Sequence, residues 1–333
     1  MSTAAVEVVR RTYLTNGEVT EVLGVLDAAS DADGVYPLSE HVMLHLRHGG
    51  DTPAVHLLVH DGDKIVGYAH VDTTDQVVGA SAELGVHPAY RRRGLGRALA
   101  QTAMAVAEEH DPAGRLRLWA HGDHPSATAL SMSLGFERYR VLWQMRRSLY
   151  APVPAAQLPD GYRLRAFVPG KDDKAWLELN NRAFAEHPEQ GRWILHDLHV
   201  RMAEPWFDPA GFLLAERISD GRLLGFHWTK VHGAANHTTT GHAHDPIGEV
   251  YVLGVDPDAQ GTGLAVPLTL AGLRYLRGRG LDQVMLYVDE SNTRATALYQ
   301  KLGFVRWITD VGFRRVVTSP RSASLDGQVP ESS

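Results

Sequence analysis

The stretch EVYVLGVDPDAQGTGLA, residues 249–265, decides the fold and organises the rest of the chain. Its first part, 249–255, is apolar and β-branched, which predicts a buried strand. A DPD turn at 256–258 ends the strand, because proline cannot donate to the ladder and aspartate favours turns. The glycine-rich segment 260–265 then opens a predicted helix. Free backbone N–H groups at such a helix start, together with the helix dipole, form an anion site that suits a pyrophosphate.

The same pattern occurs a second time in the N-terminal half, in LGVHPAYRRRGLG, residues 84–96. Gly85 and Gly254 lie 169 residues apart, and the prolines and glycines that follow them keep this spacing. Farther along, ATALSMSLGF at 127–136 matches ATALYQKLGF at 295–304, at a spacing of 168 residues. Two motifs in the same order at nearly the same spacing indicate an internal duplication of one α/β unit.

The composition limits the possible functions. A chain of 333 residues is long enough for two domains with sizeable cores. Its formal net charge of −6 argues against a broad nucleic-acid surface. The chain has no cysteine, which excludes disulfides, a thiolate zinc site and a cysteine nucleophile. Because it also lacks an apolar signal segment and a membrane-spanning apolar run, we expect a cytoplasmic protein, as a monomer, with no membrane partner.

The duplication and the composition together predict the domain boundaries. A stretch with three prolines among alanines separates the two copies, and the end of the chain is rich in serine. We expect an N-terminal domain over 1–148, a linker over 149–160, a C-terminal domain over 161–317 and a disordered tail over 318–333.

Both glycine-rich loops resemble the acetyl-CoA loop R/Q-x-x-G-x-G/A of the GCN5-related N-acetyltransferase (GNAT) superfamily. Residues 292–304, NTRATALYQKLGF, are similar to the pattern N-x-x-A-x-x-x-Y-x-x-x-G-F of its C-terminal part. The resemblance covers nearly the whole chain. It implies an α/β protein of two tandem GNAT domains, each a mixed, largely antiparallel sheet flanked by helices, with acetyl-CoA as co-substrate and no metal.

The resemblance also implies which residues contact acetyl-CoA. We expect both copies to bind acetyl-CoA or CoA, the first without turnover. Arginines of the first loop would grip phosphates, or would form a solvated basic patch, whereas the second loop would rely on backbone amides. The implied contacts are Leu84, Gly85, Val86, Arg92, Arg93, Gly94, Leu95, Gly96, Arg97, Leu253, Gly254, Val255, Gln260, Gly261, Thr262, Gly263, Leu264, Ala265, Val266, Asn292, Thr293, Arg294, Ala295, Thr296 and Ala297.

The two copies differ where amide formation needs an acid and a base. The amine must lose a proton, and the departing thiolate must gain one. The second copy has Glu249 and Tyr299 where the first, at the same spacing, has Ala80 and Ser131. We therefore expect turnover in the C-terminal half, with Glu249 as general base, Tyr299 as general acid and a backbone N–H near Leu253 as oxyanion donor. Without the motif, Glu249 would be a solvated strand end and Tyr299 a packing residue.

A narrower resemblance within the superfamily concerns the acceptor. The segments 187–191, 206–209 and 225–230 are similar to tandem enzymes that acetylate the cysteinyl amine of a cysteinyl-glucosaminyl-inositol. The alternative for each of these residues is an ordinary polar side chain at the protein surface. The implied substrate contacts are Glu40, Glu189, Lys230, Glu249 and Tyr287.

Two other functions stay open on the sequence alone. A tandem acetyltransferase for an aminoglycoside or a peptide N-terminus would keep the acid and the base. A non-catalytic acyl-CoA sensor would need neither. A Rossmann dinucleotide site is rejected, because the loop lacks the G-x-G-x-x-G spacing. The histidine-rich stretch 232–246 has no carboxylate or cysteine at regular ligand spacing, so we interpret it as a flexible loop without a metal.

Overall fold

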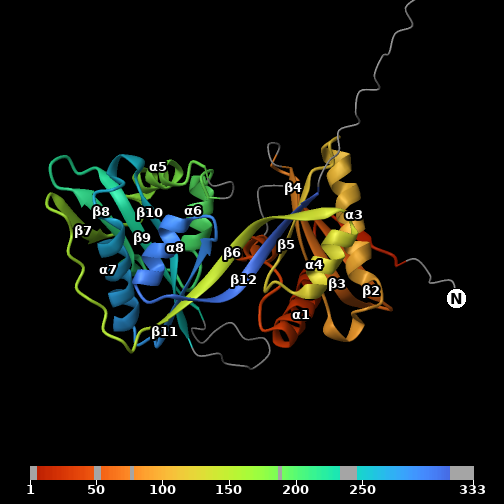
Figure 1. The fold of residues 1–333 in the computed structure, drawn as a ribbon. Helices are drawn as coiled ribbons and strands as arrows, with labels where there is room; N and C mark the ends of the chain where they lie inside the picture. Colours follow the sequence, from red (N-terminus) through yellow and green to blue (C-terminus); the bar gives the residue numbers. More distant parts are fainter. Residues whose placement is uncertain (1–5, 49–53, 76–78, 187–189, 233–245, 316–333) are drawn as a thin grey trace, which may run out of the picture. The chain divides into compact units, whose positions relative to one another are not determined.

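The computed structural model describes residues 6–48, 54–75, 79–186, 190–232 and 246–315. The chain divides into two compact units, each a sheet flanked by helices (Figure 1). Unit 1 combines residues 1–141 with 309–333, and unit 2 comprises residues 142–308. The tail expected at 318–333 lies outside the described residues.

Unit 1 contains a mixed sheet in the order β1-β2-β3-β4-β5-β12. All neighbouring strands are antiparallel except β4 and β5, which are parallel. Its elements are β1 (Val9–Arg11), α1 (Asn16–Asp33), α2 (Glu40–His48), β2 (Ala54–Asp61), β3 (Lys64–Asp72), β4 (Ala80–Val86), η1 (Pro88–Tyr90), α3 (Leu95–His110), β5 (Leu116–Ala120), α4 (Pro125–Ser133) and the end of β12 (Val305–Arg315).

Unit 2 repeats this plan in the order β6-β11-β10-β9-β8-β7. Here β10 and β11 form the parallel pair. Its elements are the end of β6 (Phe136–Ser148), β7 (Tyr162–Ala166), α5 (Asp173–Ala183), α6 (Leu195–Met202), η2 (Pro209–Gly211), β8 (Phe212–Arg217), β9 (Leu223–His232), β10 (Ile247–Val255), η3 (Pro257–Ala259), α7 (Ala265–Gly278), β11 (Gln283–Asp289) and α8 (Thr293–Lys301).

Two strand segments lie in a different unit from the one that the expected domain boundaries predict. Residues 142–148 of β6 pair with β11 of unit 2, from Leu142 opposite Asp289 onward. Residues 311–314 of β12 pair with β5 of unit 1. The expected domains 1–148 and 161–317 therefore assign each of these two segments to the opposite unit from the one whose sheet it completes.

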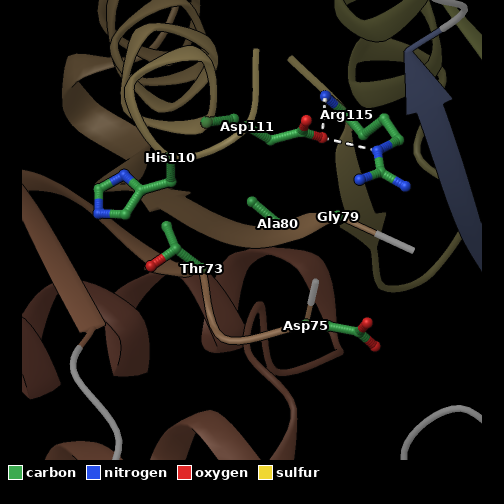
Figure 2. Close-up of a pocket in the computed structure, with 8 residues that line it drawn as sticks. Thr73, Asp75, Gly79, Ala80, His110, Asp111 and Arg115 are labelled. Carbon is green, nitrogen blue, oxygen red and sulfur yellow. Dashed lines mark hydrogen bonds and ion pairs between the residues drawn. The ribbon is translucent and has the colours of Figure 1, made fainter. Parts of the chain in front are cut away.

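A small pocket of unit 1 lies at the beginning of β4 (Figure 2). Its wall includes Ala80 and an ion pair in which Arg115 Nε donates to Asp111 Oδ2 over 2.6 Å. The glycine-rich loop of this unit follows the other end of β4, after Val86. The pocket is consequently separate from the anion site predicted for unit 1.

An aromatic core packs against one face of the sheet of unit 2. Trp228 of β9 stacks on Phe212 of β8 with ring centroids 4.4 Å apart. Trp176 of α5 meets Trp228 edge-on at 5.5 Å. On the other face, Leu273 and Leu276 of α7 lie in a cluster with strand residues of β10 and β11. Because burial of such large side chains is strongly favourable, the two faces of this sheet are fixed.

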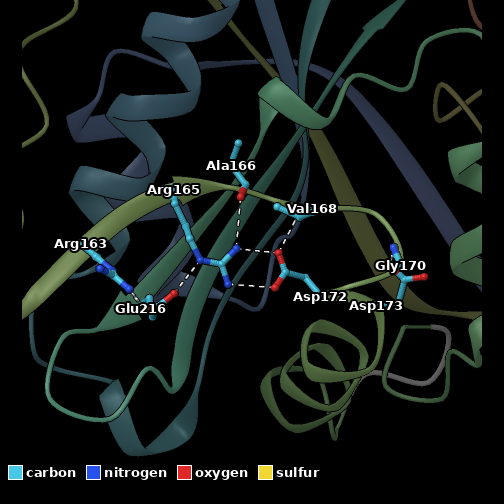
Figure 3. A network of polar contacts seen from close by, with 8 residues as sticks. All are labelled: Arg163, Arg165, Ala166, Val168, Gly170, Asp172, Asp173 and Glu216. Atoms are coloured by element: carbon cyan, nitrogen blue, oxygen red, sulfur yellow. Dashed lines mark hydrogen bonds and ion pairs between the residues drawn. The ribbon is translucent and has the colours of Figure 1, made fainter.

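A polar network fixes the edge strand β7 of unit 2 (Figure 3). Arg165 donates to both carboxylate oxygens of Asp172, over 2.6 and 2.9 Å, and its Nε donates to Glu216 over 2.6 Å. Arg163 donates to the same Glu216. Burial raises the pKa of Asp172, but the hydrogen bonds from Arg165 and the backbone of Val168 outweigh it, so the pKa lies below its usual value.

Within the described ranges, no helix is both long and apolar enough to cross a lipid bilayer.

Candidate functional site

The parallel strands β10 and β11 separate part of the way along their length. Their register runs only from Gly248 opposite Val284 to Val250 opposite Leu286, although β10 continues to Val255. The edge of β10 that faces β11 is therefore open from Val252 onward. A buried strand edge with unused backbone N–H groups is the feature that the predicted oxyanion donor near Leu253 requires.

A β-bulge distinguishes β10 from its counterpart in unit 1. The register between β9 and β10 shifts between Val250 and Val252, so Tyr251 is the extra residue. The pairing of β3 with β4 runs through without a shift. Because the bulge displaces the preceding residues by one, Ser81, and not Ala80 as expected from the sequence spacing, occupies the place of Glu249. Unit 1 has no carboxylate there under either alignment.

Glu249 is a buried carboxylate on β10, 6% exposed. Its Oε2 lies 2.6 Å from His232 Nε2, and Lys230 is directly opposite on β9. Burial raises the pKa of Glu249, but the hydrogen bond and charge of His232 and the charge of Lys230 outweigh this effect. The pKa of Glu249 thus lies below its usual value. The group is a proton acceptor at neutral pH, held in a place where few solvent molecules reach it.

Lys230 is held beside Glu249 by aromatic rings. Its Nζ lies 4.7 Å from the ring centroid of Trp206 and 5.4 Å from that of Tyr251, the bulged residue. Arg201 Nε donates to the hydroxyl of Tyr251 over 2.8 Å and its guanidinium lies over Trp193. These cation–π contacts fix a positive charge near Glu249 and hold the bulge in place.

Tyr299 is buried on α8, in the core cluster on the α7 side of the sheet. Its ring meets Phe304 edge-on at 5.7 Å. Burial raises the pKa of Tyr299 to about 12, so its hydroxyl stays protonated at neutral pH. Asn292 caps the same helix, because its side chain accepts a hydrogen bond from the N–H of Ala295 over 3.0 Å. The buried Ser131 takes the place of Tyr299 in unit 1.

The glycine-rich loop of unit 2 is anchored by Asp256, which is almost fully buried. Arg182 donates to this carboxylate over 3.0 Å, and the N–H of Asp258 over 3.0 Å. Gly261 and Gly263 adopt left-handed φ values of 83° and 89°. Helix α7 then begins without a side-chain cap. Alternating left-handed residues ahead of an uncapped helix leave backbone N–H groups free for an anion.

The loop of unit 1 has the same backbone with different chemistry. Arg92 and Gly94 adopt left-handed φ values of 64° and 86°. Arg91 forms a two-pronged ion pair with Asp33 of α1, over 2.7 and 2.8 Å, and its Nε donates to the carbonyl of Val86. The side chain of Arg91 therefore holds the loop. Arg92 and Arg93 are exposed, and the guanidinium of Arg93 lies over the ring of Tyr90 and donates to the carbonyl of Ala89.

Unit 2 brings three of the expected substrate contacts onto one face of its sheet. Cross-strand register places Lys230, Glu249 and Met285 in a row, and Tyr287 lies two residues farther along β11. Glu40 begins α2 in unit 1, and Glu189 lies outside the described residues. All five substrate contacts stay predictions. In the loop region, Arg294 Nη1 lies 3.5 Å from Gln260 Oε1, which joins two of the segments expected to contact acetyl-CoA.

The residue that sequence reasoning missed is His232. The sequence pattern predicts that it begins the histidine-rich loop, whereas it is the last residue of β9. Its spacing of two residues from Lys230 is the available signal, because residues i and i+2 of a strand share a face. The other histidines of that stretch lie outside the described residues. Among the residues described, no group of three histidine or acidic side chains could hold a metal ion.

The chain is similar to known proteins over most of its length. The acetyltransferase (GNAT) family matches residues 26–136 and 174–304, one region in each half. A mycothiol acetyltransferase of Streptosporangium roseum is 54% identical, covering 92% of this chain and 98% of its own. One from Salinispora arenicola is 56% identical, covering 92% of this chain and 96% of its own.

Solved structures agree on the architecture. A GCN5-related N-acetyltransferase from Sphaerobacter thermophilus is 26% identical, with a TM-score of 0.66 over 92% of this chain and 95% of that one. A tandem GNAT protein of the clavulanic acid biosynthesis pathway, 23% identical, has a TM-score of 0.70 over 95% of this chain and 100% of that one, a likeness of fold. The predicted fold class and the two tandem copies are confirmed.

Proposed function

Because the chain belongs to the acetyltransferase (GNAT) family, we propose that it transfers the acetyl group of acetyl-CoA to the cysteinyl amine of a cysteinyl-glucosaminyl-inositol, the last step of mycothiol formation. Relatives more than half identical over about nine-tenths of the chain are mycothiol acetyltransferases, which supports this acceptor. The single observation that carries the proposed chemistry is the ionised, buried carboxylate of Glu249 beside the opening between β10 and β11.

The proposed reaction needs no covalent enzyme intermediate. Glu249 takes a proton from the substrate ammonium, and the free amine attacks the thioester carbonyl. A backbone N–H near Leu253 binds the tetrahedral oxyanion. When the carbon–sulfur bond breaks, Tyr299 gives its proton to the CoA thiolate, and the attacking nitrogen loses its second proton as the amide forms, which restores the proton of Tyr299. Opposite environments support these two roles, since positive neighbours keep Glu249 ionised and burial keeps Tyr299 protonated.

The two units have different proposed roles, because only one of them carries the acid and the base. Unit 2 carries both groups, whereas unit 1 has Ser81 and Ser131 at the matching places. A serine hydroxyl is too weak a base to deprotonate an ammonium without help. We therefore assign turnover to unit 2, and to unit 1 the binding of acetyl-CoA or CoA at its uncapped loop and helix.

The test is a mass-spectrometric assay of the full chain with acetyl-CoA and the cysteinyl-glucosaminyl-inositol amine. Product mass is the readout, because the thiol of the substrate would interfere with detection of released CoA. Glu249→Gln keeps the size of the side chain but removes the base, and we expect a loss of about 10²- to 10⁴-fold in rate. Ser81→Ala in unit 1 is the matched control and should leave the rate unchanged.

Other outcomes would point to the rival functions. Turnover of an aminoglycoside or a peptide N-terminus in place of this amine would keep N-acetyl transfer and discard the proposed acceptor. Binding of acetyl-CoA without turnover of any amine would indicate an acyl-CoA sensor. Equal rates for Glu249→Gln and the unchanged protein would overturn the role of Glu249.

A further inference from the structure

A connected set of polar and aromatic side chains lies on β6, β11 and β12 of unit 2. Gln144 Nε2 donates to the hydroxyl of Tyr287 over 2.8 Å. Arg146 Nε donates to Gln144 Oε1 over 3.0 Å. The guanidinium of Arg146 lies 4.8 Å from the ring centroid of Trp307. We call Tyr287, Gln144, Arg146 and Trp307 the platform; the last three have no part in the site described so far.

Strand register places Tyr287, Gln144 and Arg146 on the same face as Glu249, and Trp307 joins them through its contact with Arg146. Arg146 is directly opposite Met285, which is opposite Glu249, and Gln144 is opposite Tyr287. Side chains at directly paired positions share a face of the sheet. Arg146 and Glu249 are two strands apart, which corresponds to about 10 Å between their backbones.

The platform combines exposed rings with a buried polar centre. Trp307 is 61% exposed and Tyr287 45% exposed, whereas Gln144 is 5% exposed. Single exposed rings are common on protein surfaces, but two rings on either side of a guanidinium form a surface that offers apolar and charged contacts together. The rigid amide of Gln144 links Tyr287 to Arg146, so the two groups are held at a fixed spacing.

The charge of Arg146 has no acidic partner among the described residues. Burial lowers the pKa of Arg146, and the neighbouring Tyr287 opposes this effect; no carboxylate contributes. A partly buried guanidinium usually pairs with a carboxylate, because loss of hydration must be compensated. Its remaining N–H groups are therefore available to oxygen atoms of a ligand.

We propose that the platform binds the inositol ring of the acceptor, a saturated ring with many hydroxyls. This inference rests on the proposed function. The apolar C–H face of such a ring packs on an indole, while its hydroxyls accept from the guanidinium and exchange hydrogen bonds with the phenol. A cysteine followed by two rings spans roughly 10 Å, about three residue lengths, which matches the separation of Arg146 from Glu249.

The make-up of the platform favours a polyol over a phosphate. Hydroxyls donate and accept, and the platform contains both kinds of partner, because the guanidinium of Arg146 donates while the amide oxygen of Gln144 and the phenol oxygen of Tyr287 accept. A phosphate accepts only and gains nothing from an indole face. The inositol ring of the acceptor is thus the group that uses every member.

The test compares two amines, cysteinyl-glucosaminyl-inositol and cysteinyl-glucosamine, which lacks the inositol. Arg146→Met and Trp307→Leu should each raise KM for the complete amine about 10-fold or more, with kcat nearly unchanged, because a hydrogen bond from a charged group and a stacking contact are lost. For the shorter amine the same variants should leave KM unchanged.

Arg306→Met is the matched control. Arg306 lies over Trp143 at 5.2 Å, an equivalent cation–π pair built from the sequence neighbours of the platform. Side chains at successive strand positions point to opposite faces, so this pair should affect neither amine. Equal effects of Arg146→Met on both amines, or no effect on either, would overturn the proposal.

A binding measurement separates this inference from the proposed function. Calorimetry with glucosaminyl-inositol, in the absence of acetyl-CoA, reports binding to the platform without turnover. Binding that weakens in Trp307→Leu but not in Arg306→Met would support the platform even if acetyl transfer to the complete amine failed. Turnover by the unchanged protein, with binding that no platform variant alters, would keep the function and reject the platform.

Discussion

His232 Nε2 and Glu249 Oε2 lie 2.6 Å apart, at the end of β9 and near the start of β10. The two side chains differ in exposure, since 33% of the His232 side chain and 8% of the Glu249 side chain are exposed. The hydrogen bond thus ties a carboxylate that solvent scarcely reaches to a ring at the surface. Burial alone would raise the pKa of Glu249, whereas this hydrogen bond helps to lower it.

Replacing His232 should shift the pH dependence of turnover. In His232→Ala, burial of Glu249 is opposed only by the charge of Lys230, so the pKa of Glu249 rises. A base must be ionised to act, and the acidic limb of kcat/KM therefore moves to higher pH, with most activity recovered on the alkaline side. The pH profile of kcat/KM measures this shift.

The control for His232 is another histidine of unit 2 that pairs with a carboxylate. His199 Nε2 lies 2.9 Å from Asp173 Oδ2, away from β10. We expect His199→Ala to leave the acidic limb in place. An acidic limb at the same pH in His232→Ala and the unchanged protein would show that His232 does not govern the ionisation of Glu249.

The Arg165 network predicts a stability that depends on pH. Arg165→Met leaves two buried carboxylates, Asp172 and Glu216, without their shared partner, and should cost about 3 kcal/mol at pH 7. The pKa values of both carboxylates are lowered in the folded protein. Their contribution is therefore present above the usual carboxylate pKa and is lost as pH falls, so the deficit should shrink in acid.

Denaturant unfolding of the full chain at pH 7 and in mild acid measures this deficit. Arg163→Met is the control, because Arg163 is the more exposed of the two arginines, with 60% of its side chain in solvent, and contacts Glu216 alone. It should cost less than 1 kcal/mol. A deficit for Arg165→Met that stays constant with pH would contradict the electrostatic account.

Tyr299→Phe should lower kcat by about 100-fold and leave KM nearly unchanged, since only the proton for the departing thiolate is lost. The phenylalanine ring keeps the edge-on contact with Phe304, so stability should change little. Because burial raises the pKa of Tyr299 to about 12, the unchanged protein should show no loss of activity from this group up to about pH 10. Steady-state kinetics over pH would reject the role if Tyr299→Phe kept full kcat.

Much of the architecture follows from the sequence, because the duplicated loop motifs carry their own strand and helix signals. The strand that contains Glu249, the turn that Asp256 anchors and the helix that contains Tyr299 all appear where the pattern predicts them. The difference between the two copies also distinguishes Glu249 and Tyr299, because the first copy has neither group.

Other features depend on partners that lie far away in the sequence. Segments 142–148 and 309–315 end up in the unit opposite to their linear order, because pairing in a duplicated chain is set by tertiary packing and both copies offer similar strand edges. The bulge at Tyr251 is visible only against the residues of β9. His232 was missed because the ends of strands are uncertain by one or two residues, so its spacing from Lys230 alone does not show that it continues β9.

The left-handed glycines of the second loop allow a direct test of the acetyl-CoA site. Gly261 has a φ of 83°, and a methyl group there would meet nothing within 4 Å. Gly261→Ala therefore costs only backbone strain, about 1–2 kcal/mol, which tilts the loop away from the conformation that presents its N–H groups. We expect the affinity of unit 2 for acetyl-CoA to fall about 5- to 30-fold, as seen in the KM for acetyl-CoA. Gly280→Ala is the matched control: Gly280 has a φ of 79° and equal space, but follows the far end of α7, so it should lower stability without changing this KM. The same KM for Gly261→Ala as for Gly280→Ala would mean that the loop amides do not hold the pyrophosphate.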